Sequence, residues 1–211
     1  MTTNNVNDLF LNQDFIRSGQ VLQRSLYEFL SRNTSQIAPD LSKACISSVN
    51  RAQWIITKTL AAPHRLQASL EPFLSQALID APRNDKHLVA AVEALGTILP
   101  HVTWIKRQAQ SDQDDSFVER HGHGIITGPG GLFESSTLTL GLALMAPDTC
   151  YPYHQHPPAE FYVVLSPGEW YREDEGWWSP GAGGIVLNPA SCVHAMRSAD
   201  VPLLALWGLL H

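Results

Sequence analysis

Residues Cys150 to Leu165 read Cys-Tyr-Pro-Tyr-His-Gln-His-Pro-Pro-Ala-Glu-Phe-Tyr-Val-Val-Leu, and this stretch decides the fold. It places His154, His156 and Glu160 in the order His-x-His-x3-Glu, directly before an apolar segment typical of a buried strand. Successive side chains of an extended chain alternate between two faces, so the two imidazoles are expected to point the same way. Two imidazoles and a carboxylate suit Zn, Fe, Mn, Ni or Cu, and they leave such a metal in need of another ligand.

A candidate for that ligand is His194, which closes the segment Gly-Gly-Ile-Val-Leu-Asn-Pro-Ala-Ser-Cys-Val-His beginning at Gly183. A Gly-rich turn there leads into a short apolar strand, and a turn that starts with Pro leads to the His. A His-x-His pair alone is more often two solvated or core imidazoles than a metal site. The Glu at a suitable offset and the second motif reverse that balance. The sequence therefore predicts one divalent metal ion, Zn, Fe or Mn, held by His154, His156, Glu160 and His194.

Length and composition indicate a globular protein with an ordinary core. The chain has 211 residues, of which 44% are hydrophobic and 16% charged, and its formal net charge is -6. No basic stripe is present, so nucleic acid is not an expected partner. Neither a signal peptide nor an apolar run long enough for a bilayer is evident, and we expect a soluble, cytoplasmic protein. The three cysteines are a small and odd number, which does not suit a disulfide framework.

The first part of the chain is expected to be helical, because its apolar residues recur every three or four positions. The predicted helices cover Asp14 to Arg32, Asp40 to about Pro63, Leu66 to Leu78 with an early Pro72, and Asp85 to Leu99. The polar stretch from Lys106 to Ser116 is the best candidate boundary. We therefore predict a helical N-terminal region at 1–112 and a metal-binding domain at 113–211.

The second part has the alternating apolar pattern and the Gly and Pro turns of short strands, as in 124–131, 137–145 and 201–210. The predicted fold is mainly β, a small barrel of two sheets with the metal in its interior, and with the helices either packed outside or forming a homodimer contact. A second His-x-His, at His121 and His123, lacks a suitably spaced carboxylate or distal His. It is interpreted as non-metal, with a role in lining the pocket left open.

Aromatic residues gather around the predicted metal site. Tyr151, Tyr153 and Tyr162 flank the ligands, and Trp178 follows in a Gly-Trp-Trp element. Aromatic faces bind cations that cannot donate hydrogen bonds, which makes Tyr153 and Trp178 candidates for substrate binding. A phenol beside a divalent cation loses its proton more readily and can act as a general base.

The paired motifs resemble those of the cupin superfamily. The second motif keeps the Gly, Pro and His of the family at Gly183, Pro189 and His194, whereas Ser191 and Ser198 stand where Gly and Asn are usual. These two departures affect loop shape more than ligation. The resemblance implies a cupin double-stranded β-helix, a jelly-roll-like barrel.

The run from Tyr151, the Gly-Trp-Trp element and the later Asn-Pro-Ala-Ser-Cys-Val-His resemble, more narrowly, the cupin-type dimethylsulfoniopropionate (DMSP) lyases of marine bacteria. That resemblance implies a carbon–sulfur lyase that cleaves a small zwitterionic sulfonium substrate to dimethyl sulfide and acrylate. The roles it implies are metal ligands at His156, Glu160 and His194, a ligand or a neighbour of the ligands at His154, the base at Tyr162, and a second catalytic or orienting phenol at Tyr151. Trp178, with Trp177 or Trp170, is the candidate to enclose the sulfonium.

Two other functions fit the same residues. One is an Fe(II) dioxygenase acting on a small thiol or carboxylate, which has the same ligand set. The other is a cupin that binds a ligand without turnover, in which the helices serve as an interaction element. Fold alone does not decide between these functions.

Overall fold

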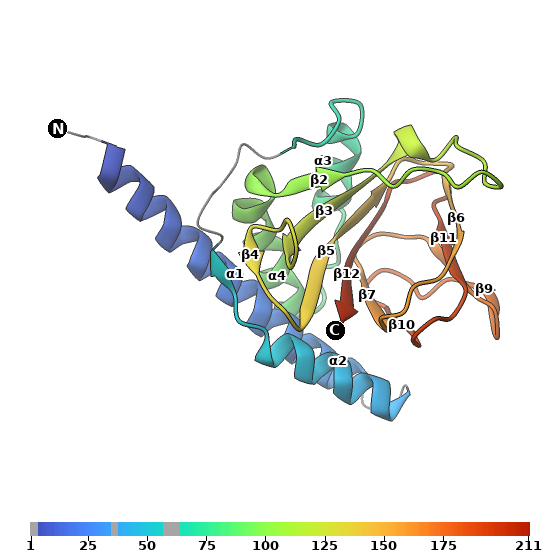
Figure 1. Cartoon of the computed structure of the whole chain (residues 1–211), viewed down its shortest axis with the longest axis horizontal. Coiled ribbons are helices and arrows are strands. Elements are labelled where there is room, and N and C mark those ends of the chain that lie inside the picture. The colour runs from blue at the N-terminus through green and yellow to red at the C-terminus, as the bar shows by residue number, and fades with distance from the viewer. Residues whose placement is uncertain (1–3, 35–37, 57–63) are drawn as a thin grey trace.

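The computed structural model describes residues 4–34, 38–56 and 64–211, and these are arranged in three layers (Figure 1). Helices form one outer layer, an 8-stranded sheet lies in the middle, and a 4-stranded sheet forms the other outer layer. The chain builds most of the helices first and then the two sheets. The expected class, mainly β with a helical N-terminal region, is confirmed.

The large sheet has the order β1-β4-β3-β5-β12-β7-β10, and β2 pairs with β3. Its strands are β1 (Ile55–Ile56), β2 (Thr103–Ile105), β3 (His121–Thr127), β4 (Phe133–Glu134), β5 (Leu138–Met145), β7 (Glu160–Val164), β10 (Ile185–Asn188) and β12 (Leu203–Leu210). All of its pairs are antiparallel except β3 with β4. Because β1 and β2 belong to the region predicted to be helical, that region adds strands to the sheet. The division at 112/113 stays a prediction.

The small sheet has the order β6-β11-β8-β9. Its strands are β6 (Cys150–His154), β8 (Glu169–Arg172), β9 (Gly176–Trp178) and β11 (His194–Arg197). Side chains of its inner face, including Trp170 and Met196, form one buried cluster with Ala143, Val164 and Ala205 of the large sheet. The two sheets therefore pack face to face around a shared core.

The two sheets are not closed into one barrel. Among the described strands, every hydrogen-bonded pair lies within one sheet or the other. The expected closure is thus corrected to an open sandwich. Short strands and side-chain packing, rather than a continuous ring of backbone hydrogen bonds, enclose the interior.

The helices cover the outer face of the large sheet. The helices are α1 (Asn4–Asn33), α2 (Pro39–Arg51), α3 (Glu71–Ile79) and α4 (Lys86–Ile98), with short 3-10 turns at Leu99–His101 and Val118–Arg120. Leu26 of α1 and Leu95 of α4 share a buried cluster with Leu140, Leu142 and Leu144 of β5. These alternate leucines point to the helices because side chains alternate along a strand.

This arrangement agrees with the expectation that the helices pack outside the sheets (Figure 1). The alternative role of the helices, a homodimer contact, stays a prediction. In the described part of the chain, no helix has the length and apolar character needed to cross a membrane.

The second helix is shorter than predicted. It ends at Arg51 rather than near Pro63, and Ile55–Ile56 form β1 against β4; residues 57–63 lie outside the described part of the chain. The side-chain amide of Gln23 donates to the carbonyls of Val49 and Ala52 at 2.7 and 2.8 Å. These bonds from a distant helix satisfy carbonyls that the end of a helix leaves free, so the stop is set by tertiary contact.

Two other helices differ from prediction only at their ends. The third begins at Glu71 rather than Leu66, because Pro72 fits only the first turn of a helix. The fourth begins after Asp85, whose carboxylate accepts from the backbone N–H of His87 at 2.7 Å and of Leu88 at 3.1 Å. Asp85 is therefore an N-cap.

Replacing Asp85 with alanine is expected to destabilise the protein by about 1 kcal/mol, because two N–H groups of α4 lose their acceptor. For a chain of this size the melting temperature is expected to fall by roughly 2–4 °C. Thermal unfolding followed by circular dichroism measures the change. Asp112→Ala, at an exposed position, is the matched control. Equal melting temperatures for the two variants would contradict the capping role.

Candidate metal centre

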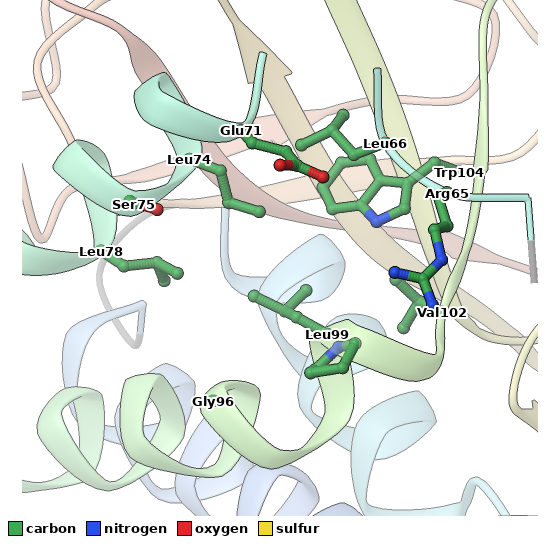
Figure 2. Close-up of a pocket in the computed structure, with 11 residues that line it drawn as sticks. Arg65, Leu66, Glu71, Leu74, Ser75, Leu78, Gly96, Leu99, Val102 and Trp104 are labelled. Atoms are coloured by element: carbon green, nitrogen blue, oxygen red, sulfur yellow. The ribbon is translucent and has the colours of Figure 1, made fainter. Parts of the chain in front are cut away.

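Two hollows of similar size differ in chemistry. One, of about 290 Å³, lies among α3, α4 and β2, where Leu66, Leu74, Leu99 and Trp104 face one another (Figure 2). Its lining holds one acid and one base, Glu71 and Arg65, and no group of metal-binding side chains. The other hollow, of about 310 Å³, is lined by His154, His156 and Glu160, three of the four ligands predicted from the sequence. The second is the candidate site.

The second hollow, called the metal cavity below, opens among strands of both sheets. Strands β3, β7 and β12 of the large sheet and β6 of the small sheet line it, together with the segment that follows β2. Its lining residues are Arg107, Gln110, His123, Tyr151, His154, Gln155, His156, Glu160, Tyr162, Trp207 and Leu209.

Three histidines converge beside this cavity. His154 ends β6, His156 follows it, and His194 begins β11, where it pairs with His154 across the ladder. One nitrogen of each imidazole lies within 4.8 Å of the others, close enough for the three to hold a metal ion. The antiparallel pairing of β6 with β11 thus joins two motifs that are far apart in the sequence.

The tautomer of each imidazole is set by the backbone. The Nδ1 atoms of His154, His156 and His194 lie 2.9, 2.9 and 3.0 Å from the carbonyl oxygens of Pro152, Pro158 and Cys192. A carbonyl only accepts, so each Nδ1 carries the proton in these bonds. The neutral form of each ring then has its lone pair on Nε2, which is the form that ligates a metal.

Glu160 lies against two of these imidazoles. It begins β7 and is 4% exposed, and one of its carboxylate oxygens is 3.1 Å from Nε2 of His194 and 3.5 Å from Nε2 of His156. Asn188, opposite it on β10, donates to the same oxygen at 3.2 Å. Burial alone would raise the pKa of Glu160, but His156 and His194 outweigh it and lower the pKa to about 2. Glu160 is therefore an anion at neutral pH.

The donor set fits a divalent cation. Nε2 of His194 is buried and has no hydrogen-bond partner among the described residues, although it lies beside the Glu160 carboxylate. A lone pair and an anionic oxygen that face each other in a buried site require a proton or a cation between them. Neutral imidazoles with a carboxylate suit Zn, Fe and Mn alike, and the structure brings together all four predicted ligands, with His154 beside His194 at 4.1 Å between ring centroids.

A β-bulge in β6 sets which side chains face the cavity. His194 pairs with His154, but Met196 pairs with Tyr151, so three steps along β6 match two along β11. The extra residue lets both Tyr151 and His154 face inward, although a regular strand would send them to opposite faces. The same bulge turns Tyr153 outward, where its side chain is 50% exposed.

Both predicted catalytic phenols line the metal cavity. Tyr162 lies two residues after Glu160 on β7, and Tyr151 lies on β6. Burial, reinforced by the Glu160 carboxylate, raises the pKa of Tyr162 well above its ordinary value. Burial also raises the pKa of Tyr151, to about 12, while the charge of Arg107 acts in the opposite direction. Without a further positive charge both phenols keep their protons at neutral pH.

The two residues predicted to bind substrate do not line this cavity. The ring of Tyr153 packs edge-on against Tyr171 at 4.8 Å on the outside of the small sheet. The Trp178 ring packs against the core between the sheets, and the Arg172 guanidinium lies 5.7 Å from its centroid.

Other cavity residues were not assigned from the sequence. His123 and Trp207 line the cavity from β3 and β12, and their rings lie 5.9 Å apart. Burial lowers the pKa of His123 to about 3, and its Nε2 has no hydrogen-bond partner among the described residues. The role in lining the pocket that the sequence left open for the second His-x-His applies to His123. The alternation of side chains along the strand could have predicted this position, because His123 and Ile125 share its inward face.

The fold and the site define the class of protein. The structure superposes on a crystal structure from work on the DMSP lyases RdDddP and RnDddQII with a TM-score of 0.67, covering 93% of this chain and 94% of that one at 20% identity. It superposes on DMSP lyase DddQ from Ruegeria pomeroyi DSS-3 with a TM-score of 0.66, covering 91% and 92% of the two chains at 22% identity. The chain therefore has the fold of these two structures.

Sequence comparison identifies the family. Residues 48–205 match the family model described as dimethylsulfoniopropionate lyase, and the chain belongs to that family. It is 34% identical over 91 residues to the DMSP lyase DddQ of Ruegeria pomeroyi, covering 43% of this chain and 45% of the relative. It is 27% identical over 108 residues to a putative DMSP lyase, DddL, of Cereibacter sphaeroides, covering 51% and 45%. These matches span about half the length of either relative.

Proposed function

We propose that this protein is a metal-dependent carbon–sulfur lyase that cleaves DMSP to dimethyl sulfide and acrylate by β-elimination. Membership of the family supports the substrate and the products. The observation that carries the metal dependence is the tautomer arrangement of the three histidines. Their Nδ1 atoms are all engaged by backbone carbonyls, while Nε2 of His194 faces the Glu160 carboxylate at 3.1 Å, where a cation can take the place of a proton.

The proposed ligands are His154, His156, Glu160 and His194. When bound, a divalent ion supplies a Lewis acid for the substrate carboxylate and a positive charge that lowers the pKa of a nearby phenol. Asn188 supports the site by donating to Glu160, which orients one of the ligands.

The proposed base is Tyr162. Its phenolate takes the proton from the carbon next to the carboxylate, and the electron pair left behind forms the carbon–carbon double bond of acrylate. The bond from the next carbon to sulfur breaks, and the sulfur leaves with the electron pair of that carbon–sulfur bond as neutral dimethyl sulfide. Tyr151, on the opposite sheet, orients the substrate. The rings of Tyr151, Tyr162 and Trp207 line the cavity and give a sulfonium aromatic faces to contact.

Removing the metal is expected to abolish activity. Dialysis against a chelator should lower dimethyl sulfide release by more than about 100-fold, because the ion contributes several kcal/mol to stabilising charge. Headspace gas chromatography after addition of DMSP measures the product, and Zn, Fe(II) or Mn is then added back. A blank without protein at the same pH corrects for spontaneous breakdown. Unchanged activity in protein shown to be metal-free by elemental analysis would contradict the proposed metal dependence.

Oxygen distinguishes elimination from the dioxygenase function. The proposed reaction consumes no oxidant, so the rate of dimethyl sulfide release under argon should equal the rate in air. A rate that falls with oxygen, together with oxygen uptake, would favour the dioxygenase and contradict the lyase.

A further inference from the structure

Arg107 lines the metal cavity with a guanidinium group of which one nitrogen is buried and lacks an acceptor in the described part of the chain. Its guanidinium lies over the Tyr151 ring, 5.3 Å from the centroid. Its Nη1 atom is buried and has no hydrogen-bond partner among the described residues. Its Nη2 makes a long contact, 3.5 Å, with the side-chain oxygen of Gln113, and the Tyr151 hydroxyl is also within hydrogen-bonding reach of the guanidinium. Part of a permanently charged group is therefore buried without an acceptor, which is costly unless a ligand supplies one.

The backbone holds this arginine in position. The N–H of Arg107 donates to Nε2 of His121 at 3.0 Å, and Nδ1 of His121 bonds to the carbonyl of Phe117 at 2.8 Å. His121 is fully buried, and burial lowers its pKa, which favours the neutral ring that accepts from Arg107. Gln113 ties the same segment to β6 by donating to the Tyr153 carbonyl at 3.0 Å. The first histidine of the second His-x-His thus fixes where the Arg107 side chain begins.

The charges around the cavity leave Arg107 without an ion pair among the described residues. Glu160 is the one acidic residue in the lining, and it is engaged by His156, His194 and Asn188. No ion pair of Arg107 with another described acid is present within 4.0 Å. Arg107 is also the one arginine or lysine in the lining. The cavity therefore offers one fixed cation to a ligand that carries an anionic group.

We propose that Arg107 binds the carboxylate of the substrate and selects for it. This inference rests on the proposed function and adds a residue that determines specificity. A guanidinium presents paired N–H donors that match a carboxylate, and a carboxylate has enough lone pairs to contact Arg107 and a metal together. Because Arg107 lies over Tyr151, a carboxylate held there places the adjacent carbon among the phenols. Such positioning is a major source of rate enhancement.

The test compares two substrates in Arg107→Met. One is DMSP, and the other is its carboxamide, which keeps the sulfonium and lacks the anion. The variant is expected to raise KM for DMSP by about 10- to 100-fold, the range for losing a hydrogen bond to a charged group. Its kinetics with the amide should stay within a few-fold of those of the unmodified protein. Arg107→Lys, which keeps the charge without the paired donors, should lie between the two.

Arg197→Met is the matched control, because Arg197 lies on the outside of the small sheet, where it pairs with Glu169 and covers Trp177. It should leave KM for both substrates unchanged. An equal loss on DMSP and on the amide would overturn the proposal, because Arg107 would then act on Tyr151 and not on the carboxylate. If Arg107→Met fails to fold by circular dichroism, the same comparison is decided by Arg107→Lys.

Binding of acrylate separates this proposal from the proposed function. Isothermal titration should show weaker acrylate binding by Arg107→Met than by the unmodified protein. If the unmodified protein releases no dimethyl sulfide but acrylate binding still depends on Arg107, the function fails and the carboxylate site stands. Equal acrylate affinity in both proteins would overturn the carboxylate site, whatever the activity.

Discussion

His194→Ala is expected to lose bound metal and dimethyl sulfide release together. The substitution removes a proposed ligand that is 2% exposed and pairs with His154 across β11 and β6. Loss of an outer partner of a ligand alone costs about 10- to 100-fold in metal affinity, and loss of the ligand itself should cost more. Elemental analysis after dialysis measures the metal, and headspace chromatography measures the product.

The control for His194→Ala is the replacement of a histidine outside the metal cavity. His64→Ala removes an exposed imidazole that does not line the metal cavity, and it should change neither metal content nor rate. Circular dichroism establishes that His194→Ala is folded. A folded His194→Ala protein with full metal content and full activity would exclude His194 from the site.

Tyr162→Phe is expected to keep the metal and lose about 10²- to 10⁴-fold in rate, the usual contribution of a general base. The ring stays in place to pack against Trp170, whose centroid lies 6.0 Å away, so the fold should be preserved. Only the hydroxyl is removed. Because the base acts in the chemical step, kcat should fall and metal content should not.

Tyr151→Phe and Tyr171→Phe are the two comparison variants for Tyr162→Phe, one inside the metal cavity and one outside it. Tyr151 lines the same cavity from the other sheet, and loss of its hydroxyl should cost less if its role is to orient the substrate. Tyr171 packs against Tyr153 and Trp177 and should be silent. A Tyr162→Phe protein with normal turnover, beside a Tyr151→Phe protein with almost none, would transfer the role of base to Tyr151.

The apolar periodicity predicted the helices well where signals local to the segment determine the helix and its ends. The predicted helix from Asp85 appears with that residue as its cap, because both the apolar period and the cap are local signals. The end of α2 was not predictable in this way. The amide that satisfies its last carbonyls comes from Gln23, and the partner of Ile55–Ile56 is a strand near residue 133. Both contacts are distant in sequence.

In the candidate site, too, local sequence signals predicted some residues, whereas others depend on contacts between distant segments. The spacing of His154, His156 and Glu160 is local, and the His194 motif supplied the fourth residue, so the proximity of these four side chains could be predicted. The outward turn of Tyr153 depends on a bulge that exists only when β6 pairs with β11. Arg107 lies in the polar stretch interpreted as a boundary between regions. A polar segment that folds over a cavity has the same composition as a solvated linker.

The bulge makes the relative lengths of β6 and β11 part of what shapes the candidate site. If one residue were inserted between His194 and Met196, three steps along β11 would match three along β6, and the regular ladder would send Tyr151 and His154 to opposite faces. A phenol or an imidazole would then leave the cavity although every chemical group of the site were still encoded. A shift of one residue in the register between β6 and β11 is therefore expected to reduce activity more than most substitutions in either strand.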